Sequence, residues 1–311
     1  MTLTVDRFLS GVKRRITMPS NQVLLKDDAI LEMADDCLRD QVVPLILSVN
    51  QNYFVALDSE VVVAEQGAYE IPERSMGRGL RDLKIQITGD PTSTKDLSLY
   101  ALEDVHLYAQ TGSPTGFYFF GDQIIVVPAP VSASYTLLKY YNMQVSSLKP
   151  TTNAAKVISV SADQVVCASA GSGLATGSKI DFVKGTGAGR ILSKDITISS
   201  LTGVTFDFPT DSVPDGLAAG DYIALAKTTP VLQIPDEVHP LLEALTCERC
   251  LEAIGDIEGA QKINAKVAEY TKNAAKVMSP RVEGETTKIN NRNGLLRGRR
   301  PSYWRTRGGF F

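Results

Sequence analysis

Residues 184–190, which read "KGTGAGR", hold glycines and cations in a pattern that could cradle a phosphate. A P-loop needs four residues between its glycines and then Lys followed by Ser or Thr, and a dinucleotide fingerprint must follow a strand and open a helix. Here Gly185, Gly187 and Gly189 simply alternate, and the residues after Arg190 favour a strand. We therefore predict a tight turn within β structure, with no phosphate site and no cofactor.

Residues 247–250, which read "CERC", place two thiols where they could hold a metal ion. On a helix, Cys247 and Cys250 share a face, but tetrahedral zinc requires two further ligands. The other cysteines and histidines do not stand at ligand spacing: Cys37, Cys167, His106 and His239. Because Cys247 also lies on an apolar stripe, we predict buried core thiols and no metal site.

The sequence gives no catalytic constellation. It has two histidines and lacks both the G-x-S-x-G elbow and the sequence context of a papain-like cysteine nucleophile. The acidic pairs Asp27–Asp28 and Asp35–Asp36 fall on helical stretches, where solvated faces are expected. A glycosidase-type pair stays open because acids are plentiful, but none stands out. We predict that the protein is not an enzyme.

The C-terminal stretch 288–311 has the most distinctive composition of the chain. Its net charge is +7, with six arginines and one lysine, whereas residues 1–287 carry −10, which together give the chain's −3. Arginine favours bidentate contacts with carboxylates or phosphates, and large aromatic side chains anchor protein interfaces. We predict that this stretch docks onto a partner protein, with DNA contact as the alternative, through Arg292, Arg297, Arg299, Arg300, Tyr303, Trp304, Arg305, Arg307, Phe310 and Phe311.

Composition also limits the possible partners and compartment. An acidic body is poorly suited to wrapping DNA, because phosphates are neutralised by a basic surface. The longest apolar runs, such as Ile124–Pro130, are far shorter than the roughly 20 residues that span a bilayer. With no apolar block of signal-peptide type near the N-terminus, we expect a soluble, intracellularly assembled protein that does not enter a membrane.

Periodicity divides the chain into helical and β parts. Apolar spacing predicts helix over 25–48, interrupted near Pro44, and again over 239–277. Residues 116–141 predict a hairpin turning at Gly121–Asp122 and a third strand that completes a small antiparallel meander. Short β-type runs without a helical stripe fill the region up to residue 230.

We therefore predict an α+β fold: a helical bundle of long amphipathic helices, a small antiparallel β-meander, and an inserted β-barrel or sandwich module. The predicted domains are residues 1–148, the N-terminal part of the core, and 149–230, the inserted β-domain. Residues 231–280 form the C-terminal helical part of the core, and 281–311 the docking arm.

Three stretches taken together resemble the head-to-tail adaptor, or connector, proteins of tailed bacteriophages. They are "YEIPERSMGRGLRDL" (69–83), "GFYFFGDQIIVVPAPVSASYTLLKYY" (116–141) and "LQIPDEVHPLLEAL" (232–245). The matching features include the Arg81–Asp82 pair, the Pro-x-Pro that ends a strand, and a second Pro that precedes a helix through Glu237 and His239. The likeness covers about residues 1–145 and 232–280, and short members of the family lack the inserted β-domain.

The resemblance implies a structural virion protein at the head–tail junction, assembled in the host cytoplasm. A homo-oligomeric ring of twelve copies would lie beneath the portal protein and extend the DNA channel. It would give the tail nozzle, hub or fibre proteins a platform, and double-stranded DNA would pass through without sequence-specific binding. The alternative functions are a nucleic-acid-binding virion module, which uses the basic C-terminal stretch on the packaged DNA end, and a virion-associated cell-wall hydrolase.

Overall fold

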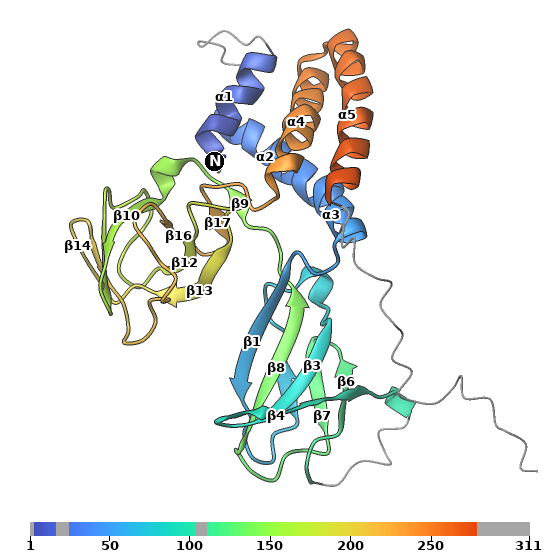
Figure 1. The fold of residues 1–311 in the computed structure, drawn as a ribbon, viewed down its shortest axis with the longest axis vertical. Helices are drawn as coiled ribbons and strands as arrows, with labels where there is room; N and C mark the ends of the chain where they lie inside the picture. Colours follow the sequence, from blue (N-terminus) through green and yellow to red (C-terminus); the bar gives the residue numbers. More distant parts are fainter. Residues whose placement is uncertain (1–2, 17–24, 104–110, 279–311) are drawn as a thin grey trace, which may run out of the picture. The chain divides into compact units, whose positions relative to one another are not determined.

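The computed structural model describes residues 3–16, 25–103 and 111–278 (Figure 1). Strands make up 33% and helices 32% of the described residues. The predicted bundle of long amphipathic helices is therefore wrong: between residues 55 and 229 the described residues form strands β1 to β17 with their loops, and the only helical segments among them are single 3-10 turns. The stretches with helical periodicity, near both ends of the described residues, form short helices.

The helices lie near the two ends of the described chain. Their bounds are α1 Val5–Arg15, α2 Asp27–Cys37, η1 Leu38–Val42, α3 Val43–Val49, α4 His239–Ile254 and α5 Ile257–Met278, with single 3-10 turns at η2 Met76–Arg78, η4 Thr151–Asn153 and η5 Asp236–Val238. Among the described residues, no helix is both long and apolar enough to cross a membrane.

Gly255 and Pro44 mark two local features of these helices. Gly255 takes a left-handed φ of 87° and ends α4, and the amide of Asp256 donates to the carbonyl of Leu251 at 2.9 Å. Such a glycine cap satisfies the last carbonyls of a helix. Between α2 and α3 the π-helical segment η1 precedes Pro44, which has no amide proton to donate to the preceding turn. The helical backbone does not end at Pro44 but continues to Val49.

The helices share one apolar core. Fully buried side chains from α1, α2 and α4, such as Phe8, Ile30 and Leu242, pack together with Leu148 and Ile234 from the connecting segments. Helices α4 and α5 lie side by side (Figure 1). Helix α5 buries only Ala260 and Ala274, so most of its surface faces solvent in the single chain.

Residues 55–142 form two four-stranded sheets around a second core. Their strands are β1 Val55–Val61, β2 Ala68–Glu70, β3 Asp82–Ile87, β4 Asp90–Asp96, β5 Ser98–Leu99, β6 Gly116–Phe120, β7 Gln123–Val127 and β8 Tyr135–Asn142. One sheet has the order β1-β8-β3-β4 and the other β2-β7-β6-β5. Leu83 and Leu137 of the first sheet pack against Phe117 and Ile124 of the second, as in a β-sandwich.

The predicted small meander is therefore also wrong. Strands β6 and β7 form the expected hairpin, with Phe120 paired to Gln123 across the Gly121–Asp122 turn. Strand β8, however, does not continue that sheet, because it lies between β1 and β3 in the other one. Pro128 and Pro130 interrupt the pairing after β7, and the chain then crosses to the opposite layer.

A third core lies within residues 155–225. The strands there are β10 Ala155–Val160, β11 Gln164–Cys167, β12 Lys179–Val183, β13 Ile191–Thr197, β14 Ser200–Thr202, β15 Thr205–Asp207 and β16 Tyr222–Leu225. They are hydrogen-bonded in the order β13-β12-β16-β10-β11-β15-β14. One apolar cluster, which includes Val165, Phe182 and Phe206, fills the space that they enclose. A parallel pair, β9 Ser147–Leu148 with β17 Thr228–Thr229, brings together the chain entering and leaving this β-module.

Candidate functional site

The predicted docking residues, Arg292 through Phe311, lie outside the described residues. Their role stays a prediction. The structure does describe the other candidates except His106, and it brings out an ion-pair cluster and a cavity that the sequence had not indicated.

The thiols of Cys247 and Cys250 are buried and free. Burial raises the pKa of Cys247 to about 12 and that of Cys250 to about 11. The sulfur of Cys250 lies 3.7 Å from the sulfur of Met33. Within the described ranges, no group of three or more His, Cys, Asp or Glu side chains gathers to hold a metal ion.

His239 is buried at the start of α4, where its Nε2 lies 3.2 Å from the carbonyl oxygen of Ile234. Burial lowers the pKa of the imidazole, and Asp236, with its carboxylate 3.9 Å away, opposes that shift. This contact connects Ile234, just before the turn, to helix α4, so the role of His239 is structural.

The most buried ion pair described joins the loop between β2 and β3 to the β-module. Arg74 Nη1 lies 2.8 Å from Asp181 Oδ2, and Nη2 lies 2.9 Å from Oδ1, which makes the pair bidentate. Asp181 is fully buried in β12, and Arg74 is 5% exposed. A buried charge is tolerated only with a partner and additional hydrogen bonds.

Asp181 has those additional bonds. Its oxygens also accept from the backbone amides of Asp195 at 3.0 Å and Lys227 at 3.1 Å, two residues with left-handed φ. Burial raises the pKa of the Asp181 carboxyl, and Arg74 opposes that shift. Arg74 Nη2 also reaches Asp195 Oδ1 at 3.1 Å. The cluster therefore fixes β12, β13 and the turn before β17 against the segment that carries Arg74.

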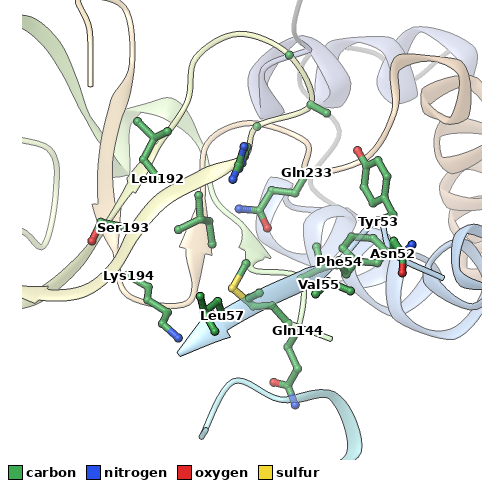
Figure 2. A pocket seen from close by; sticks show the side chains of 18 of the residues that line it. Asn52, Tyr53, Phe54, Val55, Leu57, Gln144, Leu192, Ser193, Lys194 and Gln233 are labelled. Carbon is green, nitrogen blue, oxygen red and sulfur yellow. The ribbon is translucent and has the colours of Figure 1, made fainter. Parts of the chain in front are cut away.

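A cavity of about 830 Å³ lies close to this joint. Figure 2 shows Asn52 and Tyr53 on one side, Leu192, Ser193 and Lys194 on the other, and Gln233 between them. The segment 187–190 of the glycine-rich turn also lines it. The prediction of a turn between strands is confirmed, since residues 184–190 connect β12 to β13.

The glycine-rich turn is held close to the segment before α4. Gly187, Ala188 and Gly189 all have left-handed φ, at 62°, 54° and 56°. A Cβ added to Gly189 would lie 2.9 Å from the carbonyl oxygen of Leu232, whereas one added to Gly187 would meet nothing within 4 Å. Only glycine fits at position 189 without displacing backbone.

The lining of the cavity is cationic and contains no acid. Its charged members are Arg190 and Lys194, whose ammonium is bonded to the Tyr141 hydroxyl and lies 3.3 Å from Asp58. The amide Nε2 of Gln233 is buried without a hydrogen-bond partner among the described residues. Asp58 therefore offsets the charge of Lys194, and the exposed Arg190 is the other cation of the lining.

The sequence held weak signals for these residues. Asp181 stands alone within the apolar strand "KIDFV", where an acid must be paired. Arg74 lies in the stretch 69–83 that carries the adaptor resemblance. Neither signal names the partner, because the two residues are 107 positions apart.

Comparison with known proteins gives no family model that matches the chain, and no curated protein matches it.

Proposed function

We propose that this chain is a structural head-to-tail adaptor of a tailed bacteriophage. Copies of it would form a ring beneath the portal, extend the DNA channel and offer a platform to tail, nozzle or fibre proteins. The basic stretch 288–311 would dock onto the portal through its arginines and aromatic side chains. The proposal assigns no catalytic step to the chain.

The observation that carries the proposal is that the three adaptor-like stretches adjoin one another in the fold. Strand β2 pairs with β7 and β3 pairs with β8, so the first two stretches share both sheets of the sandwich. The third stretch meets the segment that follows β8 through Gln233, whose Oε1 accepts from the amide of Ser146 at 3.0 Å, and Gln233 lines the same cavity as Tyr140 of β8.

Two residues of the adaptor-like stretches, Arg81 and His239, also connect neighbouring segments of the chain. Arg81 donates from Nη1 to the carbonyl of Gln51 just after α3, and its amide donates to Tyr140 in β8 at 2.8 Å. His239 connects the entering segment to α4. Such fixed joints suit a subunit that must keep one shape around a ring, where a head-to-tail interface closes only at a defined rotation.

The charge distribution supports the same function. The net charge of −10 on residues 1–287 would let DNA slide through a channel without adhering, and the +7 on residues 288–311 would be attracted to acidic groups on a portal. The test is the copy number of the chain bound to purified portal protein, measured by native mass spectrometry and electron microscopy. We expect a closed ring of twelve chains of 33.7 kDa; single or unclosed copies would contradict the proposal.

The alternative, a nucleic-acid-binding virion module, is favoured by the same +7 charge. It predicts DNA affinity that falls steeply with salt and is lost when residues 288–311 are deleted. No DNA binding at low salt would exclude it.

A further inference from the structure

Helix α5 presents a row of exposed lysines on the side away from its two buried alanines. At about 100° per residue, all four lysines fall within about 120° of the helix circumference. They stand in two pairs with a spacing of four residues, and like charges at this spacing destabilise a helix. None of them forms an ion pair with another described residue. This lysine row consists of Lys262, Lys266, Lys272 and Lys276.

The net charge of α5 is positive although the helix also holds Glu258 and Glu269, since four lysines face two acids. An ordinary solvated helix face pairs Glu with Lys four residues later. In α5 only Glu258 and Lys262 follow that pattern, whereas Lys262 with Lys266 and Lys272 with Lys276 break it. A surface of opposite charge beside the row would offset this repulsion.

Helix α2 carries the opposite charge with the same spacing. Its eleven residues hold five acids and no base. Asp28, Glu32 and Asp36 follow one another every four residues on its exposed side, and we name them the acidic row. Asp28 and Glu32 form no ion pair with another described residue, while Asp36 shares Arg249 with Asp40 at 3.5 and 3.4 Å. The acids of this row repel one another as the lysines of α5 do.

The two helices pack on opposite sides of α4. Glu248 of α4 accepts from the side-chain amide of Asn264 in α5 at 2.5 Å, whereas the sulfur of Cys250 lies 3.7 Å from that of Met33 in α2. Two positions along an α-helix differ by about 200° around its axis. The exposed rows of α2 and α5 therefore face away from each other in one chain. Complementary faces on opposite sides of a subunit are what a head-to-tail interface between identical copies requires.

We propose that the lysine row of α5 in one copy docks against the acidic row of α2 in the next copy. Both rows advance by about 6 Å for each step of four residues, so that opposite charges meet along the two packed helices. A single exposed charge pair contributes little affinity, but complementary rows select the partner and fix the register. The inference rests on the proposed ring, for which it names the faces that join neighbouring subunits.

The test is self-association of the full chain without portal, measured by sedimentation velocity over a dilution series. We expect reversible association at low salt. It should weaken when the ionic strength is raised from about 0.01 M to about 1 M, because exposed charges are then screened over about 3 Å instead of about 30 Å.

Charge reversal locates the contact. One variant combines Asp28→Lys with Glu32→Lys, and the other combines Lys262→Glu with Lys266→Glu. Each variant alone is expected to raise the dissociation constant at least about tenfold, because like charges then face each other between copies. An equimolar mixture of the two should associate as the unaltered chain does, since the unchanged lysine row of one variant meets the unchanged acidic row of the other.

The matched control combines Lys95→Glu with Lys156→Glu. It changes the net charge by the same amount as the lysine-row variant, on exposed cations of β4 and β10, and should leave association unchanged. Circular dichroism of each variant verifies that it is folded.

Three results would overturn the inference. They are an unaltered chain that stays monomeric at every concentration, an equal loss of association in the control, and a mixture of the two charge-reversed variants that does not associate. Because no portal is present, these results leave the adaptor proposal standing. That proposal is tested separately, by the ring that the unaltered chain forms on the portal.

Discussion

Arg74 and Asp181 form a bidentate ion pair with N–O distances of 2.8 and 2.9 Å, although they are 107 positions apart in the sequence. Both side chains are buried, and the pair joins the loop before β3 to strand β12 of the β-module. It is the clearest indication that this module is held in place by specific contacts.

Arg74→Met should lower the free energy of unfolding by about 3–5 kcal/mol, because it leaves a buried carboxylate without its cation. Unfolding by denaturant measures this change in the free energy of unfolding. The double variant Arg74→Met with Asp181→Asn should be more stable than the single variant, since no uncompensated charge remains. The control is Arg78→Met, which breaks the exposed pair with Asp122 and should cost less than about 1 kcal/mol. Equal losses at Arg74 and Arg78 would contradict the role of burial.

Stability should fall as the pH is lowered from 7 towards 5.5. Burial lowers the pKa of His239 below its ordinary value of 6.5, so the unfolded chain takes up a proton in this range before the folded chain does. The contribution of one such group cannot exceed about 1.4 kcal/mol per pH unit. His239→Gln should flatten the dependence, as measured by denaturant unfolding at several pH values. An unchanged slope would show that His239 does not titrate differently in the two states.

Gly189→Ala should be more destabilising than Gly187→Ala. Both positions have left-handed φ, which costs an L-residue about 1–2 kcal/mol. Only at Gly189 does the new Cβ also meet the carbonyl of Leu232, which adds about 1–3 kcal/mol of overpacking. The difference between the two unfolding free energies measures the contact alone. Equal losses would mean that the turn is not held against this segment.

The four cysteines should resist alkylation in the native protein at pH 8. All are buried, and burial raises the pKa of Cys37 and Cys250 to about 11 and of Cys167 and Cys247 to about 12. The thiolate is the reactive form, so both access and ionisation are suppressed. Mass spectrometry after maleimide labelling should find modification only in denaturant. An added exposed thiol, Ser59→Cys, supplies the fast-reacting control; rapid native labelling of Cys247 or Cys250 would contradict their burial.

The sequence could predict features set by local pattern. The helical stripes over 25–48 and 239–277, the turn at 184–190 and the burial of Cys247 follow from spacing and composition. The sandwich could not be predicted in this way, because alternation marks a strand without naming its neighbour. Strand β8 followed the β6–β7 hairpin in sequence but paired with β1 and β3.

The buried ion pair and the cavity could not be predicted from the sequence for a related reason. The pairing of Arg74 with Asp181, and the position of Arg190 near Gln233, arise only when distant segments pack. The helical bundle was overestimated because the periodic stretches are the strongest signals in the chain, whereas the short strands between them are individually weak.

The most direct test of the adaptor proposal is the binding of two proteins to purified portal: the full chain and a chain that lacks residues 288–311. Co-sedimentation, with circular dichroism to verify that both are folded, gives the comparison. We predict that the full chain binds the portal and that the deletion abolishes binding while leaving the fold intact. Equal binding of both chains, or no binding by either, would contradict the account.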